Sequence, residues 1–480
     1  MSKFNFKKMF SIDGAARPDE NDLDVLAKWM RTSKRLDSKI PAGYTYLAQF
    51  VDHDISFDSL SRQFFPWEEM DLGTIENLRN PVFDLETIYG KEAETSSEYL
   101  KPNSAKLGMG KTSYETISTI QREIEQDLPR DEKGKAKIYE DRNDENLLIA
   151  QTHVAFMLFH NLVVDTIGGA DETEKYSKAR EMVIRHYQYI VLKDLLPKII
   201  KPSVLDSVLT GENKFYNPET EDSFMPLELS VAVYRMGHSM VRNSYQVNTK
   251  QNKLTLSDLQ SFTGSGERIR RTKTLPGDWL IDWSLFFNLT NWENPPEKFN
   301  FARRIDTKIS SGLGDFLGLF DYDRRSSVAA LDLFRGRLFN LPTGQMVAKA
   351  IGEEPLDPAE IEKLLPPELK NVFRDYTPLW FYILAEVEIA NAKKIEAEPK
   401  GNPEMQETLG NVGSRIVAEV FVELLRRSPH SILDKGLPSQ INFPSRGEGF
   451  VGEEPGDFGM AKMLNLIGRN SADFMNPFAG

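Results

Sequence analysis

The sequence predicts a mainly α-helical protein with little β-structure, and three observations lead to this prediction. Apolar residues recur at helical spacing over most of the 480-residue chain. Strand signals are sparse, because no series of alternating residues is joined by short turns. No glycine-rich loop of the dinucleotide-binding type joins a strand to a helix. Hydrophobic residues make up 40% of the chain, which is ample material for a large packed core.

Six segments are predicted to be core helices. Several of them are apolar on nearly every side, as expected inside a large bundle rather than on its surface. In chain order they are Gly43–His53, Asp144–Asp165, Ala179–Lys193, Leu227–Arg242, Pro378–Ala392 and Gly410–Arg427. Two polar stretches, from about Glu92 to Lys137 and from about Phe443 to Phe458, are predicted to be long surface excursions and not domain boundaries.

The composition excludes several kinds of site. The chain has no cysteine, so disulfides, zinc–thiolate sites, iron–sulfur clusters and cysteine-ligated haem are excluded. Any metal must be held by histidines, carboxylates or carbonyls. The net charge of -13 and the pI near 5.2 argue against binding nucleic acid over a broad surface, which needs a basic footprint. Small molecules or basic partners are expected instead.

The N-terminal segment, MSKFNFKKMFSIDGAARPDEND, lacks an apolar core of the length that a secretory signal needs. We therefore expect a cytoplasmic protein, with export without a cleaved signal as the alternative. The aromatic and lysine residues between Phe4 and Phe10 can touch a membrane, but a frayed terminal tail is the favoured interpretation. The longest apolar runs, such as 154–159 and 378–387, fall far short of the roughly 20 residues that span a bilayer, so no transmembrane helix is expected.

Histidine is scarce, with six residues in the whole chain, so a histidine-based site has few candidates. In YLAQFVDHDISFD, Gln49, Asp52 and His53 are spaced i, i+3, i+4, which puts them on one helical face. This face offers a base with polar companions. A capped helix end with an ordinary carboxylate-paired histidine explains the same residues equally simply.

A second histidine, His238, lies on an otherwise apolar helix in LELSVAVYRMGHSMVRNSY, directly after Gly237. The glycine leaves room for a flat ligand, and a neutral imidazole in an apolar wall is what a haem axial ligand needs. A core histidine bonded to a carbonyl is the alternative. His153 and His160, in THVAFMLFHN, are interpreted as structural, because two histidines without a nearby carboxylate make a poor metal site.

Four segments taken together resemble the signature of the animal-type haem peroxidases, the peroxidase–cyclooxygenase superfamily, and of its bacterial branch in particular. They are DHD on one helix, EDRNDEN opening a second, YRMGHSM on a third and AALDLFRGR further along. Further stretches resemble bacterial members, among them NLRNPVFDLETIYG, LPGDWLIDWSLFF and LFNLPTGQMVA. The resemblance runs from about Pro41 to Gly468. It implies a single large helical haem peroxidase domain over residues 41–480, with residues 1–40 as an N-terminal extension.

Position by position, the resemblance implies that His53 is the distal base, which moves a proton from the near oxygen of hydrogen peroxide to the far one. Arg142 falls on the distal arginine, whose charge stabilises the negative charge that develops as the O–O bond breaks. Without the resemblance, Arg142 reads as a surface arginine in a charged run. Gln49 falls on the polar residue that holds the distal water or a halide.

On the opposite side, the resemblance implies that His238 is the proximal iron ligand and that Arg235 lies near a haem propionate. Asp332 stands where the family usually has an asparagine that accepts a hydrogen bond from the other ring nitrogen of the ligand. A carboxylate there gives the imidazole more anionic character and lowers the reduction potential, provided that it points at the ring.

Asp52 and Glu145 fall on the two carboxylates that form ester links to the haem in mammalian relatives. Arg142 and Glu145 are spaced i, i+3, so both can face one pocket. The resemblance therefore implies either an ester-linked haem or haem b, with the same carboxylates serving as hydrogen-bond partners in the second case.

A calcium site is also implied, and the residues at its ligand positions all offer hard oxygen. They are Asp54, Asn80, the carbonyl of Val82, Asp84 and Glu86. Asn80 and Glu86 replace hydroxyl residues that are common in the mammalian enzymes, which leaves the coordination number and the affinity open. A salt-bridged loop is the alternative.

The implied function is a peroxidase that reduces hydrogen peroxide through an oxoferryl intermediate and oxidises phenols or halides such as iodide and bromide. A fatty-acid dioxygenase is one alternative, but that chemistry uses a tyrosine three residues before the iron ligand. Arg235 occupies that position here, and Tyr234 lies about 100° away around the helix. A haem-binding or adhesion scaffold without activity is the other alternative, which the joint presence of His53, Arg142 and His238 disfavours. The oligomeric state does not follow from the sequence.

Overall fold

The computed structural model describes residues 4–12, 18–58, 75–91, 99–114, 122–211, 214–218, 224–264, 266–315, 327–399, 401, 403–435 and 458–470. Helices dominate this part of the chain, and the strands are short, which confirms the predicted mainly α fold with little β-structure. The α-helices are α1 (Glu20–Met30), α2 (Gly43–Ile55), α3 (Glu86–Tyr89), α4 (Leu147–Thr166), α5 (Glu172–Tyr189), α6 (Leu196–Ile199), α7 (Pro202–Leu209), α8 (Gly237–Met240), α9 (Leu256–Leu259), α10 (Glu267–Thr272), α11 (Gly312–Asp315), α12 (Val328–Leu338), α13 (Gly344–Ala350), α14 (Pro358–Leu364), α15 (Lys370–Phe373), α16 (Leu379–Ala397), α17 (Asn411–Arg427), α18 (Ile432–Lys435) and α19 (Met460–Asn470).

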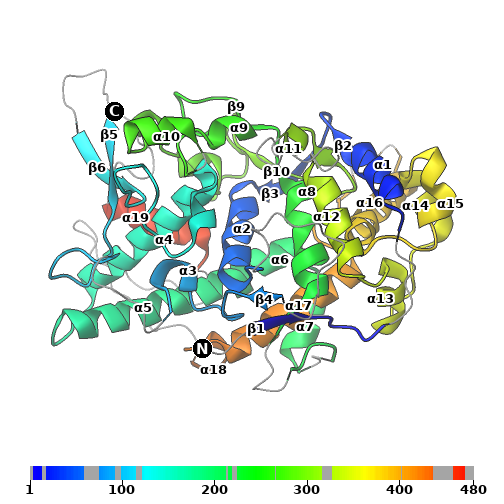
Figure 1. Ribbon diagram of the computed structural model, residues 1–480, viewed down its shortest axis with the longest axis horizontal. Helices are drawn as coiled ribbons and strands as arrows, with labels where there is room; N and C mark the ends of the chain where they lie inside the picture. Colours follow the sequence, from blue (N-terminus) through cyan, green and yellow to red (C-terminus); the bar gives the residue numbers. More distant parts are fainter. Residues whose placement is uncertain are drawn as a thin grey trace.

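Helix α2 lies near the centre of the molecule, with α4 on one side and α8 and α12 on the other (Figure 1). It packs directly against α4 and α8, and α4 packs in turn against α5 and α19. Nearly every residue of α2 is buried, including Leu47, Phe50 and Val51. A helix that is apolar on all sides is stable only inside such a bundle, which is why the sequence pattern predicted its position correctly.

Three of the predicted helices are observed with nearly the predicted bounds, namely α2, α16 and α17. The second predicted helix begins later than expected. Residues Asp141–Asp144 form a 3-10 segment, η4, and α4 starts at Leu147 after Asn146 accepts a hydrogen bond from the backbone N–H of Ile149 at 3.1 Å. Asparagine is a favoured N-cap because its side chain satisfies a donor that the helix leaves unpaired.

The predicted helix Leu227–Arg242 is not continuous. It consists of a π segment η6 (Glu228–Ala232), a 3-10 segment η7 (Val233–Met236) and the single turn of α8, which ends before Arg242. Ala232 has φ -124° and ψ -68°, outside the helical region, so the hydrogen-bond ladder changes register at this residue. The change sets the direction in which the side chains of the following turns point.

The predicted helix Ala179–Lys193 belongs to a longer rod that starts at Glu172. After α5 it continues through a π segment η5 (Ile190–Leu195) into α6. Pro197 lies in the first turn of α6, and its ring removes a backbone donor and clashes with the preceding turn. The wider π turn directly before the proline accommodates this clash.

The strands form small sheets at the edges of the helical core. One sheet has the order β4–β1–β7, and the others are pairs. The strands are β1 (Phe4–Lys7), β2 (Arg31–Thr32), β3 (Asp37–Pro41), β4 (Glu76–Asn77), β5 (Gly110–Tyr114), β6 (Arg122–Asp127), β7 (Phe224–Pro226), β8 (Ser244–Tyr245), β9 (Leu254–Thr255), β10 (Phe301–Arg303) and β11 (Ile309–Ser310).

The N-terminal segment is part of the fold, so the interpretation of residues 4–10 as a frayed tail is wrong. Strand β1 pairs antiparallel with β4 and parallel with β7. The backbone N–H groups of Met9 and Phe10 then donate to the buried carboxylate of Glu228, at 2.8 and 3.2 Å. Residues 18–40 also pack on the rest, since α1 contacts α12 and β3 pairs with β10. The division of the chain at residue 40 stays a prediction.

The first predicted surface excursion is only partly correct. Its described residues include the β5–β6 hairpin, and Leu107 and Leu128 are buried in the core. Arg130 ties the end of the hairpin to the main body, with ion pairs to Asp127 at 3.0 Å and to Asp144 at 2.7 Å. The second excursion, 443–458, lies outside the described residues except for Phe458.

One described helix is long and apolar enough to cross a membrane by length and composition alone, contrary to expectation. It is α4, and 94% of its most apolar window is buried inside the protein. It packs against α2, α5 and α19, as the core helix of a bundle does.

Buried histidines make the fold sensitive to acid. Burial lowers the pKa of His160 and of His186 to about 4 and that of His153 to about 3. His160 is also held in one neutral tautomer between the hydroxyl of Tyr89 (3.1 Å) and the carbonyl of Ala105 (3.0 Å). Each group is neutral when folded and charged when unfolded near pH 5.

We predict that stability is fully present above about pH 6.5 and is lost as the pH falls toward 4, because a folded-state pKa below the unfolded value favours protonation of the unfolded chain. For His160 alone the loss at pH 5 is roughly 2 kcal/mol. Melting temperatures at pH 7 and pH 5 measure this loss. His160→Gln should flatten the dependence. An unchanged slope in the His160 variant would contradict the prediction.

Candidate active site

The predicted haem-site residues come from α2 and from four further segments. Helix α2 carries Gln49, Asp52, His53 and Asp54, η4 carries Arg142, and Glu145 directly follows η4. Segments η7 and α8 carry Arg235 and His238, and α12 carries Asp332. Helix α2 packs against α8 and η4, and α12 packs against η6. The two histidines therefore belong to adjoining elements.

His53 is buried and held from behind by an asparagine that sequence reasoning missed. The Nδ1 atom of His53 lies 2.7 Å from Oδ1 of Asn143, and Nδ2 of Asn143 lies 3.0 Å from Nδ1 of His153. Because the asparagine oxygen only accepts, we assign the His53 proton to Nδ1, which leaves Nε2 as a base. The only signal in the sequence was that Asn143 directly follows Arg142.

The environment of His53 keeps the imidazole neutral. Burial, and then the positive charge of Arg142, lower its pKa to about 4, while Glu140 and Asp52 act in the opposite direction. Within the part of the chain that the structure describes, Nε2 of His53 makes no hydrogen bond. A neutral imidazole with a free Nε2 can accept a proton from a bound molecule.

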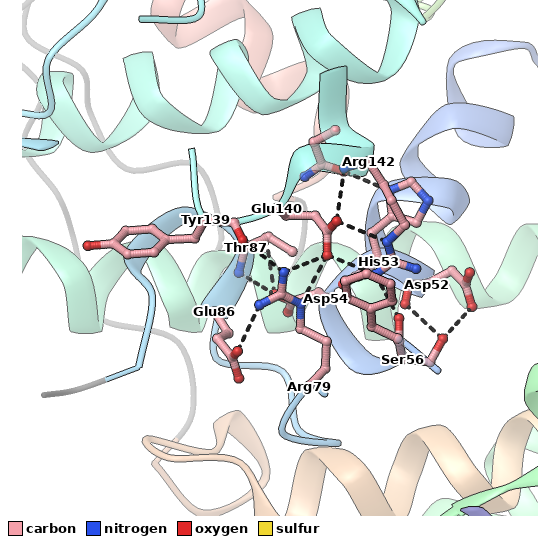
Figure 2. A network of polar contacts seen from close by, with 12 residues as sticks. Asp52, His53, Asp54, Ser56, Arg79, Glu86, Thr87, Tyr139, Glu140 and Arg142 are labelled. Atoms are coloured by element: carbon pink, nitrogen blue, oxygen red, sulfur yellow. Dashed lines mark hydrogen bonds and ion pairs between the residues drawn. The ribbon is translucent and has the colours of Figure 1, made fainter. Parts of the chain in front are cut away.

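Arg142 is fixed beside His53 and is not a loose surface residue (Figure 2). Its Nε and Nη2 atoms donate to Glu140 at 2.9 and 2.8 Å. Nη2 also donates to the carbonyls of His53 (3.1 Å) and Ser56 (2.8 Å), and the guanidinium lies 4.2 Å from the ring of Phe57. Among the described residues Nη1 has no hydrogen-bond partner, so it is left for a bound group.

His238 is held by the carboxylate of Asp332, the residue that the family resemblance placed behind its ring. Its Nδ1 atom lies 2.5 Å from Oδ2 of Asp332, which is itself 2% exposed. The carboxylate therefore does point at the ring. In the described part of the chain Nε2 of His238 has no hydrogen-bond partner, and a Cβ built on Gly237 would meet no atom within 4 Å. The unpaired Nε2 atom of His238 could bind a metal ion, and the open space at Gly237 leaves room for a flat group beside it.

Gln49 and Glu145 are brought together directly. The Gln49 amide donates to the Glu145 carboxylate, and Asn146 donates to the Gln49 carbonyl at 3.4 Å. Burial raises the pKa of Glu145 to about 7, although Arg142 lowers it, and His238 lowers it too.

A cavity with about 390 Å³ of space, part of it open to solvent, lies at the end of α2. Asp52, Arg142, Arg235 and Arg335 line it, whereas His53 and His238 are not among the described residues of its lining. Arg335 was not predicted, although its position three residues after Asp332 in LDLFRGR puts both on one helical face. Arginines are the side chains best suited to bind carboxylates such as haem propionates.

Three of the predicted calcium ligands, Asn80, Val82 and Asp84, lie in the loop between β4 and α3, next to Asp54 near the end of α2. The buried carboxylate of Asp54 accepts hydrogen bonds from the backbone N–H groups of Leu85 and Thr87 and from the Thr87 hydroxyl, at 3.1 to 3.2 Å. Asn80 donates to Asp84 at 3.4 Å. Burial raises the pKa of Asp54 and of Asp84 above their usual range.

Glu86 lies next to these residues, since its backbone N–H donates to Asp84 at 3.0 Å, but its carboxylate is already paired. Its carboxylate forms an ion pair with Arg79 at 2.8 Å and accepts a hydrogen bond from the backbone N–H of Asn80 at 3.1 Å. Over the described residues, no group of three or more His, Cys, Asp or Glu side chains could hold a metal ion. The salt-bridged loop, which was the alternative, describes Glu86 better, and we derive no step through calcium.

A family model described as "Animal haem peroxidase" matches residues 73–360, well over half of the chain. The matched stretch contains η4, α8 and α12, and thus Arg142, His238 and Asp332, whereas α2 precedes it.

The curated relatives are similar over part of their length only. Chorion peroxidase of Drosophila melanogaster is 24% identical over 267 residues, which is 53% of this chain and 31% of that protein. Thyroid peroxidase of Mus musculus is 24% identical over 197 residues, which is 37% of this chain and 21% of that protein. The chain therefore spans about a third or less of these relatives.

Solved structures with the same fold cover almost the whole chain. Peroxidase A from Dictyostelium discoideum has a TM-score of 0.57 at 14% identity and covers 89% of this chain and 87% of its own. The fatty acid α-dioxygenase of Oryza sativa has a TM-score of 0.61 at 12% identity and covers 96% of this chain and 80% of its own. At these identities the likeness shows the fold alone.

Proposed function

Because this chain belongs to the animal haem peroxidase family, an oxidoreductase family, we propose that it is a haem-dependent peroxidase. It reduces hydrogen peroxide and oxidises small one-electron donors such as phenols, or halides such as iodide and bromide. One observation carries the proposal. Two imidazoles on adjoining elements each have Nδ1 engaged by an oxygen, while Nε2 is free among the described residues.

The residues that would hold the haem are present and suitable. Nε2 of His238 would bind the iron, and Arg235 and Arg335 would meet the propionates. Asp52 and Glu145 would contact the haem edge, either as hydrogen-bond partners of haem b or through ester links. When bound, the haem supplies the electron transfer that peroxide reduction and donor oxidation require.

The remaining chemistry belongs to side chains of this chain. With haem bound, Nε2 of His53 would accept a proton from one oxygen of hydrogen peroxide and return it to the other oxygen, which would leave as water, while the haem would supply the two electrons. Arg142 directs its free Nη1 donors at the negative charge that develops on the leaving oxygen. Asn143 holds the His53 ring in the tautomer that this transfer needs.

Fatty-acid oxygenation is the alternative, and it is motivated by the fold shared with the plant α-dioxygenases. Arg235 occupies the position three residues before His238. The hydroxyl of neighbouring Tyr234 is buried and lacks a hydrogen-bond partner among the described residues, and its ring packs against Phe421. Oxygen uptake with linoleate in the absence of peroxide would favour this alternative.

We predict that His53→Ala and Arg142→Ala each lower peroxide-dependent phenol oxidation by the haem-reconstituted protein on the order of 10² or more. One change removes the base and the other the fixed positive charge. Steady-state kinetics measure the loss, with haem content checked by absorbance. His160→Gln, a buried histidine away from the site, is the control and should keep the parent rate. Unchanged turnover in both alanine variants would remove both residues from the mechanism.

Replacing Asp332 with asparagine should raise the reduction potential of the haem iron. The neutral amide no longer withdraws the ring proton of His238, so the ligand stabilises ferric iron less. We expect a rise on the order of 60 mV, a tenfold change in a one-electron equilibrium. Spectroelectrochemical titration measures it. Asp282→Asn, a buried carboxylate elsewhere, should leave the potential unchanged, and an unchanged potential in the Asp332 variant would contradict the prediction.

Covalent attachment is predicted through Asp52 or Glu145. After peroxide turnover, part of the haem should stay with the chain during extraction with acidified acetone. The double variant Asp52→Asn with Glu145→Gln should release all of it, because amides cannot form the ester. Complete release from the parent protein would show that the haem is bound without a covalent link.

A further inference from the structure

A chain of four charged side chains, three of them buried, runs from the first residue of α3 to the candidate distal arginine. In spatial order it is Glu86, Arg79, Glu140 and Arg142, and we refer to it as the ion-pair chain (Figure 2). Positive and negative groups alternate along it. The side chains of the first three residues are at most 9% exposed, and that of Arg142 is 21% exposed.

Glu140 is the centre of the chain and is fully buried. Its Oε1 accepts hydrogen bonds from the backbone N–H and the Nε of Arg142, both at 2.9 Å. Its Oε2 accepts from Nη2 of Arg142 at 2.8 Å and from Nε and Nη2 of Arg79 at 3.0 and 2.6 Å. Burial opposes its ionisation, yet the guanidinium groups of Arg142 and Arg79 hold the pKa of Glu140 well below its usual range.

These bonds determine where Arg142 can point. With Nε and Nη2 occupied by Glu140 and by the two carbonyls at the end of α2, the guanidinium plane is fixed and Nη1 is left over. Arg142 also lines the cavity beside Asp52. A fixed donor is worth more to a reaction than a mobile one, because it needs no reorganisation when charge develops.

Arg79 connects the ion-pair chain to the loop where calcium was predicted. Its Nη1 atom binds Glu86 at 2.8 Å, and its Nη2 atom also donates to the carbonyl of Tyr139 at 3.0 Å. Glu86 is thus neutralised by a guanidinium of the same chain. The charge of a buried carboxylate with an ion-pair partner and a backbone hydrogen-bond donor is already compensated, so a bound cation would stabilise it little.

We propose that Glu140, clamped by Arg79, is the positioning residue for Arg142, and that Arg79 supplies the positive charge that a bound cation would otherwise bring to this wall of the site. The inference rests on the proposed function for the role of Arg142. It goes beyond it by assigning the orientation of that residue to a built-in ion-pair chain.

The test uses the full-length haem-bound protein with Glu140→Gln and Glu140→Asp. Glutamine keeps the size of the side chain but removes its charge, so the guanidinium of Arg142 is no longer held in one orientation. The reaction with peroxide should therefore slow roughly 10-fold to 100-fold. Cyanide, a small anion that binds ferric haem, should bind more weakly by a similar factor, which gives a readout independent of turnover. Aspartate keeps the charge and should restore most of both.

Asp127→Asn is the matched control, because Asp127 belongs to an equally buried set with Arg130 and Asp144 that does not contact Arg142. It should lower the melting temperature but leave peroxide reactivity and cyanide affinity at the parent level. Parent values in Glu140→Gln, or the same losses in Asp127→Asn, would overturn the positioning role. If Glu140→Gln fails to fold, Arg79→Lys replaces it, since lysine keeps the charge but not the forked geometry, and parent values there would overturn the role equally.

The proposal that Arg79 takes the place of a bound cation is tested separately. The melting temperature and haem content of the parent protein should be the same after treatment with a calcium chelator and after addition of excess calcium. A drop of several degrees on chelation would overturn this part of the proposal. If the parent shows no peroxidase activity at all, the proposed function fails, while cyanide binding and the chelation test still decide the positioning role.

Discussion

The wall of the site that carries His53 depends on one constraint, which is that the fully buried carboxylate of Glu140 must be neutralised by partners from the chain itself. Its partners, Arg142 and Arg79, come from two segments some sixty residues apart. Arg142 then donates to the carbonyls of His53 and Ser56 at the end of α2, and Arg79 binds Glu86, the first residue of α3. One buried charge therefore joins three segments through bonds that have directions, which apolar contacts lack.

The two imidazoles of the site differ in the oxygen behind each ring. His53 faces the neutral amide of Asn143, which can accept a hydrogen bond without making the imidazole ring more anionic. His238 faces the carboxylate of Asp332, which draws the ring proton and makes Nε2 a stronger electron donor. A base that must both accept and return a proton suits the first environment, and a metal ligand suits the second. The difference in partners, rather than in the histidines, separates the two roles.

Sequence reasoning located the helices wherever burial on all sides produced a continuous apolar pattern, as in α2, α16 and α17. It could not locate the register change at Ala232, because a π turn followed by a 3-10 turn leaves the apolar composition of the segment unaltered. Motifs located His53, Arg142, His238 and Asp332. Their companions Glu140 and Asn143 could not be found in this way, because the contact between His53 and Asn143 joins residues ninety positions apart and depends on how η4 packs against α2.

The loop beside α2 shows how one substitution changes what a site can bind. Asp54 and Asp84 are already two buried carboxylates whose charges repel each other, and burial raises the pKa of both. A third carboxylate at position 86 would increase that repulsion unless it were paired. Arg79 forms this pair, at 2.8 Å, and compensates the charge of Glu86. The glutamate and the arginine are therefore best understood as one unit, because either residue alone would leave an uncompensated charge inside the protein.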